Sequence, residues 1–412
     1  MLSETSNCNS AASRYPSKVR RTSSKRALYV LLIVLPLLLI AAAIPFAATA
    51  VKADHATPPA APAAQAPGID PIFAVQAGLD GEIFPVFANY GSLQHSRDRR
   101  LSAVSVNVTN PGSDPLRARI AVQIPGWSDQ EIQIADVPAG QARSYVFSPS
   151  FLPRLYANRE IVAATASVNI TDMSGHLLYA GTLPVRLRAV EDMYWGRDFK
   201  YAPFIASWVT PHDPQVEEIL SRAKETMPGR RLPGYEPWKN TAAQTHSTFQ
   251  QAKAIYDALQ QKGVSYVKSS MTFGEHQGVS ERVRMPSESL GEVSANCIDG
   301  AVMYASLFEN LGMDPVVVLV PGHAYVGVRE ALNSQDYLYI ETSLTGRTSF
   351  ESAVLAASHG LARVKPADVL RVSIAQARRD GIFPMPAPAT RERQNASVAR
   401  DDVASTDAAG SR

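Results

Sequence analysis

Residues 315–328 carry the sequence PVVVLVPGHAYVGV. The apolar run at 316–320 predicts a buried strand, which the Pro-Gly pair at 321–322 ends with a turn. In the extended piece that follows, odd positions hold His323 and Tyr325, whereas even positions hold small or apolar residues. Because side chains alternate between the two faces of a strand, we expect His323 to lie on the face opposite the apolar residues.

Residues 337–343 show the same parity, with Glu341 at an odd position and Leu338 and Ile340 at even ones. If the two pieces form a hairpin centred near 332–334, the two residue numbers of each facing pair add up to about 664 to 668. Glu341 then lies opposite His323 or one diagonal step away. A hydrogen bond between the imidazole and the carboxylate is therefore feasible.

The third chemically informative residue is Cys297, in the sequence Asn296-Cys297-Ile298-Asp299. Either Asn296 or Ser294 can cap a helix, so we expect Cys297 in the first turn of a helix that ends near Gly312. The positive end of a helix dipole favours a thiolate over a thiol. A thiolate, an imidazole and a carboxylate together suit nucleophilic catalysis.

Each of these residues alone is weak evidence. A single histidine is most often a structural residue, and a glutamate at the end of a strand is usually solvated. The chain has two cysteines, of which Cys297 is the only one after residue 8, so no intrachain disulfide is possible in that part. A lone thiol in an exported chain is either an inert buried residue or a nucleophile.

Several motifs, in this order, resemble those of the bacterial transglutaminase-like superfamily: RMPSESL at 284–290, NCID at 296–299, LGM at 311–313, VPGHAYVGV at 320–328 and IET at 340–342. The resemblance extends over residues 198–384. It implies a papain-like fold in which the cysteine helix packs on an antiparallel sheet that bears the histidine and the acid.

The resemblance also implies a role for each residue of the site. Cys297 is the nucleophile, His323 the general base and acid, and Glu341 the orienting carboxylate, at a position where many members have Asp. The backbone N–H of Cys297 is the expected first oxyanion donor. Gln277 and Trp208 are candidates for the second.

Residues 71–190 have the pattern of half-buried strands. Apolar side chains alternate with polar ones at Val104 to Val108, Ile120 to Ile124, and Ile132 and Ile134, and turn clusters separate the runs. This spacing predicts an all-β, immunoglobulin-like sandwich without its disulfide. After Trp195 helical patterns follow, at 216–225 and at 242–261.

The N-terminal region predicts export. Residues 1–26 contain six basic residues and one acidic residue, and the apolar segment 27–51 follows. Basic residues are retained in the cytoplasm, so the segment is expected either to anchor the rest of the chain outside the cytoplasm or to be cleaved near Ala50. An Ala/Pro-rich linker at 52–69 and a disordered tail at 386–412 complete the chain.

The predicted fold class is therefore multidomain: an N-terminal membrane segment, an all-β immunoglobulin-like sandwich at 71–190 and an α+β papain-like domain at 198–384. A formal net charge of +2 and the lack of a basic patch after residue 26 argue against nucleic-acid binding. No cofactor is expected, and the histidines lack metal-ligand spacing.

Two functions remain open from the sequence. The first is an exported transglutaminase-like thiol enzyme that performs acyl transfer, or amide or peptide hydrolysis, through a thioester, on a protein or peptide of the cell envelope. The second is a catalytically inactive binding or scaffold protein in which Cys297 is a core residue. The oligomeric state is left open.

Overall fold

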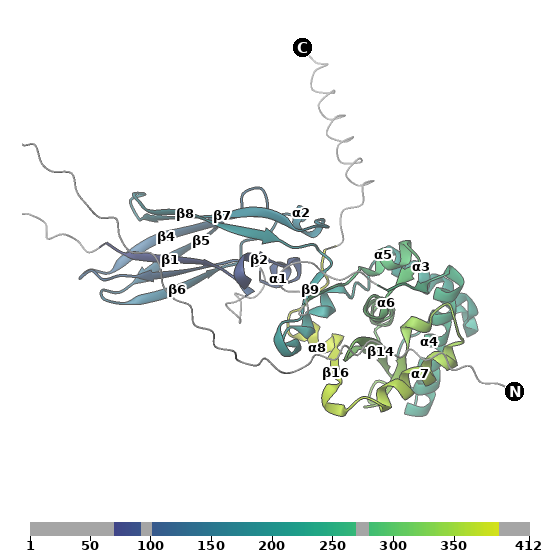
Figure 1. Ribbon diagram of the computed structural model, residues 1–412. Coiled ribbons are helices and arrows are strands. Elements are labelled where there is room, and N and C mark those ends of the chain that lie inside the picture. The colour runs from purple at the N-terminus through teal and green to yellow at the C-terminus, as the bar shows by residue number, and fades with distance from the viewer. Residues whose placement is uncertain (1–69, 92–100, 269–279, 387–412) are drawn as a thin grey trace, which may run out of the picture. The chain divides into compact units, whose positions relative to one another are not determined.

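The computed structural model describes residues 70–91, 101–268 and 280–386 (Figure 1). The chain divides into two compact units, Met1–Ala64 and Gln65–Arg412, and all the described residues belong to the second unit. The domain limits predicted from the sequence stay predictions.

Several segments predicted from the sequence lie outside the described residues. These are the basic tail 1–26, the apolar segment 27–51, the linker 52–69 and residues 387–412 of the predicted C-terminal tail. In the part of the chain that the structure describes, no helix is both long enough and apolar enough to cross a membrane.

The predicted fold class is wrong. The described residues form a mixed α/β structure with several sheets, rather than an all-β immunoglobulin-like sandwich followed by a papain-like α+β domain. Helices α1 (Pro85–Gly91) and α2 (Pro153–Tyr156) lie among the strands of the first part, and Phe87 joins the hydrophobic core that surrounds α6 (Cys297–Asn310). Strand periodicity detects neither short helices nor packing between distant segments.

The β-rich first part contains two sheets and their connections. One sheet has the order β1-β3-β6, and the other has the order β2-β8-β7-β4-β5, in which only the β2–β8 pair is parallel. The strands are β1 (Ile72–Ala77), β2 (Glu82–Ile83), β3 (Val104–Thr109), β4 (Leu116–Gln123), β5 (Glu131–Val137), β6 (Ala142–Phe147), β7 (Val162–Asp172) and β8 (Leu177–Leu187), and a 3-10 helix, η1 (Leu79–Gly81), precedes β2.

Side chains from both sheets form one hydrophobic core, and β3 follows its predicted alternation. Val104, Val106 and Val108 are fully buried, and the residues between them are half-buried. Branched side chains pack well on a pleated surface, so such a run forms a strand with one face in the core. The strand predicted around Ile120 is also present, as β4.

In β5 the strand is present, but its predicted inner face is wrong. Ile132 and Ile134 are 43% and 40% exposed. Their polar neighbours face inward instead, because Glu131 Oε2 accepts the Ser148 N–H at 2.7 Å and Gln133 Nε2 donates to a carbonyl of β6 at 2.7 Å. These bonds satisfy one backbone group in β6 and one directly after it, at the edge of its sheet, which strand alternation alone cannot predict.

The second part contains helices packed on small sheets. Its helices are α3 (Pro214–Ala223), α4 (Thr241–Lys262), α5 (Pro286–Gly291), α6, α7 (Phe350–Ala362) and α8 (Ile374–Arg379), with 3-10 turns η3 (Arg197–Phe199), η4 (Ala202–Trp208), η5 (Lys224–Thr226), η6 (Pro228–Arg230), η7 (Thr342–Leu344) and η8 (Pro366–Asp368). Two short pairs complete it: β9 (Asp192–Tyr194) with β11 (Ser280–Arg282), and β10 (Ser265–Tyr266) with β12 (Ser294–Ala295).

Helices α3 and α4 form where the sequence predicts them. Asp213 caps α3 by accepting the Gln215 N–H at 2.9 Å, and Pro214 occupies the first helical position. At the C-terminal end of α4, Gly263 adopts a left-handed conformation with φ 91°, which a residue without a Cβ adopts at low cost.

The sheet that bears His323 has the order β15-β14-β13-β16, all antiparallel. Its strands are β13 (Pro315–Val320), β14 (His323–Arg329), β15 (Tyr337–Ile340) and β16 (Leu370–Ser373). Val326 faces Ile340, so the numbers of paired positions total 666, and the predicted hairpin register is confirmed. His323 thus begins β14, and Glu341 directly follows β15.

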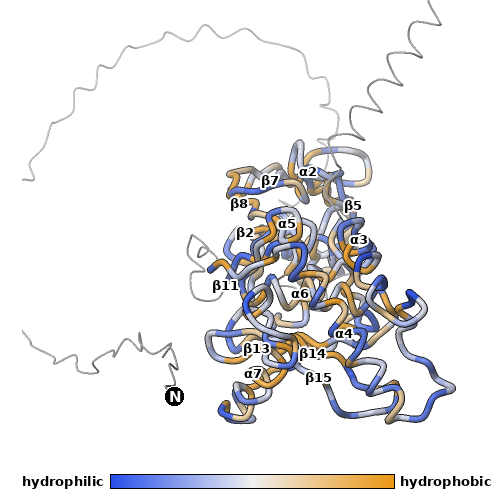
Figure 2. Tube along the Cα trace, turned by 90° about the vertical axis from the view of Figure 1, so that its right-hand side faces the viewer, coloured by the Kyte–Doolittle hydropathy of each residue, from blue (hydrophilic) through white to orange (hydrophobic). Residues whose placement is uncertain are grey.

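This sheet is covered on both faces. Val326, Val328 and Ile340 pack in the core that includes α6, whereas Val316 and Val318 pack with Tyr325 and α7 on the other side. Strand β13, which lies between β14 and β16, is among the most hydrophobic segments in Figure 2. A continuous apolar run is typical of a strand buried on both faces. The sheet therefore holds His323, at the start of β14, in a fixed position.

The packing of α6 can be tested at Phe308, a fully buried side chain on this helix. Replacing it with alanine removes apolar contacts and leaves a cavity, so we expect Phe308→Ala to lower the free energy of unfolding by about 3–5 kcal/mol. Leu355→Ala is the matched control, because Leu355 on α7 is 58% exposed and should lose far less. Urea unfolding of both variants measures the difference, and equal losses would contradict this account of the core.

Candidate functional site

Cys297 is the first residue of α6, as predicted. Asn296 is the N-cap: its side chain accepts the Asp299 N–H at 2.8 Å, and the Asp299 carboxylate accepts the Asn296 N–H at 3.1 Å. This reciprocal pair fixes the first turn. Cys297 is a half-buried free thiol. Because it is the first residue of α6, it lies at the positive end of the helix dipole, where negative charge is stabilised.

Asp299 holds this turn against the preceding chain. Its side chain is fully buried, and its two carboxylate oxygens accept the backbone N–H and the Nε–H of Arg284, both at 2.9 Å. Burial raises the pKa of Asp299, although the bonds from Arg284 and Asn296 oppose this effect. With so many donors around it, the carboxylate anchors the start of the helix.

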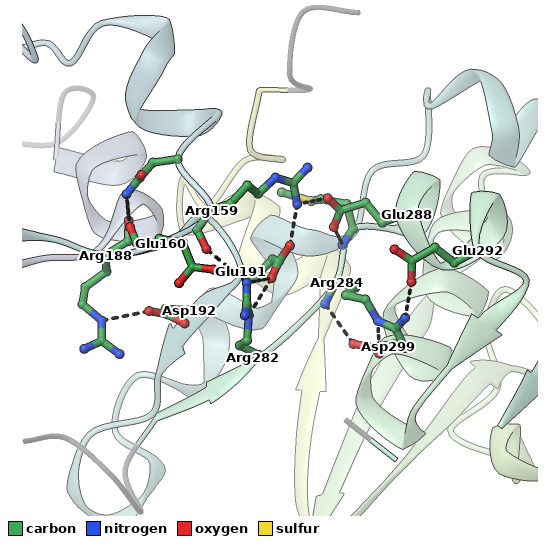
Figure 3. A network of polar contacts seen from close by, with 12 residues as sticks. Arg159, Glu160, Arg188, Glu191, Asp192, Arg282, Arg284, Glu288, Glu292 and Asp299 are labelled. Atoms are coloured by element: carbon green, nitrogen blue, oxygen red, sulfur yellow. Dashed lines mark hydrogen bonds and ion pairs between the residues drawn. The ribbon is translucent and has the colours of Figure 1, made fainter. Parts of the chain in front are cut away.

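Figure 3 shows this ion pair beside further ion pairs that reach the β-rich part. Arg159, in the turn before β7, pairs with Glu191 and with Glu288 on α5, and Arg282 also pairs with Glu191. Glu288 in turn caps α5 by accepting the Met285 N–H at 2.9 Å. Because Arg159 is partly exposed, its two pairs contribute about 1 kcal/mol or less each, and the pair with Glu288 serves mainly to orient α5.

His323 contacts both of its predicted partners. Its Nε2 lies 2.7 Å from Glu341 Oε2, and the Cys297 side chain is close enough to the ring to raise its pKa. Since Nε2 faces the carboxylate, Nδ1 is the ring atom left for the sulfur. The Tyr325 ring packs edge-on against the imidazole, with 4.7 Å between ring centroids, and limits its rotation.

Glu341 is the N-cap of η7, and its two carboxylate oxygens have different partners. Oε1 accepts the N–H of Ser343 at 3.1 Å and its hydroxyl at 2.6 Å. Oε2 faces His323. Burial raises the pKa of Glu341, but the hydrogen bonds and positive charge of His323, together with Ser343, outweigh burial and lower it.

Cys297 and Glu341 together set the charge on the His323 imidazole. Burial lowers the pKa of His323, yet the hydrogen bonds to Cys297 and Glu341 and the negative charges of these groups raise it from 6.5 to about 10. The ring is therefore protonated at neutral pH in the folded protein. An imidazolium between a sulfur and a carboxylate can stabilise a thiolate and can donate a proton.

A close contact between α6 and η7 keeps the cysteine near the acid. The Thr342 hydroxyl donates to the Cys297 carbonyl at 3.3 Å. A Cβ at Gly300 would lie 2.6 Å from Thr342 Oγ1, so only glycine fits at this point of the helix. Sequence reasoning missed Gly300 and Ser343. A glycine inside a helix is the one available signal, because it costs about 1 kcal/mol relative to alanine and so indicates a close approach.

Of the two candidates for a second oxyanion donor, the structure describes Trp208 but not Gln277, and both stay predictions. Trp208, at the end of η4, is fully buried, and its Nε1 has no hydrogen-bond partner among the described residues. Two residues later, Thr210 N–H donates to Ser306 Oγ at 2.9 Å. Ser306 lies nine residues beyond Cys297 on α6, about 13 Å along the helix. Gln277 lies outside the described residues.

A metal site was not expected from the sequence. Within residues 70–91, 101–268 and 280–386, no group of three or more His, Cys, Asp or Glu side chains could hold a metal ion. That the chain works without a metal or cofactor stays a prediction.

Comparison with known proteins adds no relative. A scan against models of protein families finds no match, and no curated protein matches the chain. The resemblance to the transglutaminase-like superfamily, and the roles that it implies for Cys297, His323 and Glu341, therefore stay predictions.

The contact at Gly300 makes a direct test possible. In Gly300→Ala the new methyl group meets the Thr342 side chain, so we expect the free energy of unfolding to fall by about 1–3 kcal/mol. Gly291→Ala is the control, because its Cβ would have only ordinary contacts with Gln215. The measurement is urea unfolding of the two variants. A Gly300→Ala protein as stable as the control would show that α6 and η7 are not in contact.

The pair His323–Glu341 predicts a pH dependence of stability. The raised pKa of His323 gives a contribution that is complete below pH 6.5 and is lost as the pH rises through about 10. The lowered pKa of Glu341 gives a contribution that is complete above pH 4.5 and is lost at lower pH. The stability difference between the native chain and His323→Gln, measured by urea unfolding, should therefore be largest between pH 4.5 and 6.5. A difference that grows from pH 6.5 to 10 would contradict this.

Proposed function

We propose that this chain is a thiol enzyme that transfers or hydrolyses acyl groups through a thioester. Cys297 is the nucleophile, His323 the general base and acid, and Glu341 the carboxylate that orients the imidazole. One observation carries the proposal: the His323 ring lies 2.7 Å from Glu341 and close enough to Cys297 that both side chains raise its pKa. The motif resemblance to the bacterial transglutaminase-like superfamily supports the same roles.

In the first half-reaction the Cys297 thiolate attacks the carbonyl carbon of an amide. A C–S bond forms, and the carbonyl oxygen becomes an oxyanion, to which the Cys297 N–H at the start of α6 can donate. The imidazolium of His323 gives its Nδ1 proton to the leaving nitrogen, and the C–N bond breaks. The products are a thioester and a free amine or ammonia.

In the second half-reaction a water molecule or an amine attacks the thioester. The neutral imidazole of His323 accepts a proton from the attacking group, and Glu341 stabilises the imidazolium that forms. The C–S bond breaks and the thiolate returns. Water gives hydrolysis and an amine gives transfer, so both outcomes use the same three residues.

We further propose that the substrate is a protein or peptide of the cell envelope. This rests on the basic residues and apolar segment at 1–51, which predict export and lie outside the described residues. The alternative function is a catalytically inactive binding or scaffold protein. The half-buried state of Cys297 and its place beside a charged imidazole favour the enzyme, because an inert core cysteine needs neither.

The reactivity of Cys297 tests this function without knowledge of the substrate. In a Cys8→Ser background Cys297 is the only thiol, so iodoacetamide reports on it alone. At pH 6 a free thiol is almost wholly protonated, whereas a thiolate paired with imidazolium should react at least about tenfold faster. We expect His323→Ala to remove most of this advantage.

The matched control is His359→Ala, because His359 is an exposed residue of the last turn of α7 and has no part in the hydrogen bonds that join the three site residues. It should leave the alkylation rate unchanged. Equal rates for the native chain, His323→Ala and a free thiol would favour the scaffold function. Trapping of a thioester on Cys297 with a peptide library would then identify the acyl donor.

A further inference from the structure

The carboxylate of Glu341 has one oxygen directed at the imidazole of His323 and one bonded to Ser343. Oε1 accepts two hydrogen bonds from a single residue, the Ser343 hydroxyl at 2.6 Å and the Ser343 N–H at 3.1 Å. Oε2 is left for His323 Nε2, at 2.7 Å. The direction in which Glu341 presents its charge is thus set by Ser343.

A glutamate needs such a support. Its side chain has several rotatable bonds, and fixing a flexible side chain of this kind costs up to about 1.5–2 kcal/mol of conformational entropy. A hydrogen bond to a charged group contributes about 1.5–3 kcal/mol, which is enough to offset that cost. The hydroxyl bond at 2.6 Å is in the range of strong, charge-assisted bonds.

Ser343 is itself held by the surrounding structure. It is the middle residue of η7 (Thr342–Leu344), whose end is fixed from two helices. Tyr256 on α4 donates its hydroxyl to the Leu344 carbonyl at 2.8 Å, and the Tyr304 hydroxyl of α6 lies 2.9 Å from Thr345 Oγ1. A donor on such a rigid turn can position a carboxylate, whereas one on a loose loop cannot.

We propose that Ser343 is a positioning residue of the site, which holds Glu341 so that its free oxygen meets the imidazole and keeps Cys297 paired with a charged ring. The inference rests on the proposed function and extends the set of three residues to a fourth that touches no substrate. The hydroxyl is the part that matters, because every residue other than proline would supply the backbone N–H at this position.

The test compares four variants in the Cys8→Ser background. Ser343→Ala removes the hydroxyl. Ser343→Thr keeps it, and Ser343→Val has the shape of the Thr variant without it, so this second pair remains informative even if the Ala variant folds poorly. Ser358→Ala is the control, because the Ser358 hydroxyl is exposed on α7 and donates to the Val354 carbonyl of its own helix.

Two quantities are measured: the pKa of the His323 ring by NMR, and the rate of Cys297 alkylation at pH 6. Without the hydroxyl the carboxylate binds imidazolium less well, so we expect the pKa to fall by about one unit from its raised value in the Ala and Val variants. The alkylation rate should fall about three- to tenfold. Ser343→Thr should keep both quantities near their native values, and Ser358→Ala should change neither.

A purely structural role would lower the stability of the variants without moving the pKa of His323 in the folded protein. An unchanged pKa and rate in Ser343→Val, with His323-dependent alkylation in the native chain, would overturn this inference alone. If alkylation of the native chain does not depend on His323, the proposed function fails, and the role of Ser343 fails with it.

Discussion

Asp299 is fully buried, and its carboxylate accepts N–H groups from two segments, the backbone and side chain of Arg284 and the backbone of Asn296. A buried charge is stable only when it is paired and hydrogen-bonded, so this carboxylate requires all of its donors to be in place. The first turn of α6 is thereby fixed to the chain that precedes α5. Because Cys297 lies in that turn, the position of the thiol depends on a residue that takes no part in the proposed chemistry.

Glu341, like Cys297, is held in place by a residue that takes no part in the proposed chemistry. Glu341 lies at the end of an edge strand, where a side chain is normally mobile and solvated, but here η7 folds back and Ser343 holds one of its oxygens. The contact between Gly300 and Thr342 then sets the separation of the two sides. Two rigid elements, a capped helix and a capped turn, therefore bring a sulfur, an imidazole and a carboxylate together, with the histidine supplied by the end of β14.

The charges of His323 and Glu341 support one another. Burial alone would favour a neutral imidazole, yet the pKa of His323 is raised to about 10, because the ring lies between two groups that carry or can carry negative charge. Each ionised group stabilises the charge of its neighbour in a partly buried environment, where such interactions are stronger than in water. The imidazolium of His323 and the carboxylate of Glu341 are thus held in their charged forms by their own geometry.

The sequence by itself determined the local features. The apolar run of β13, the parity of His323 and Glu341 and the cap at Asn296 depend on neighbours a few residues away, and here the strands, the hairpin register and the helix start agree with expectation. It did not determine the fold class, the exposed face of Ile132 in β5, or the support of Glu341 by Ser343. These depend on which distant segments meet, such as β5 with β6 and η7 with α4 and α6. Only the tertiary structure decides such contacts, because they come from packing and hydrogen bonding between segments whose separation along the chain has no periodic signal.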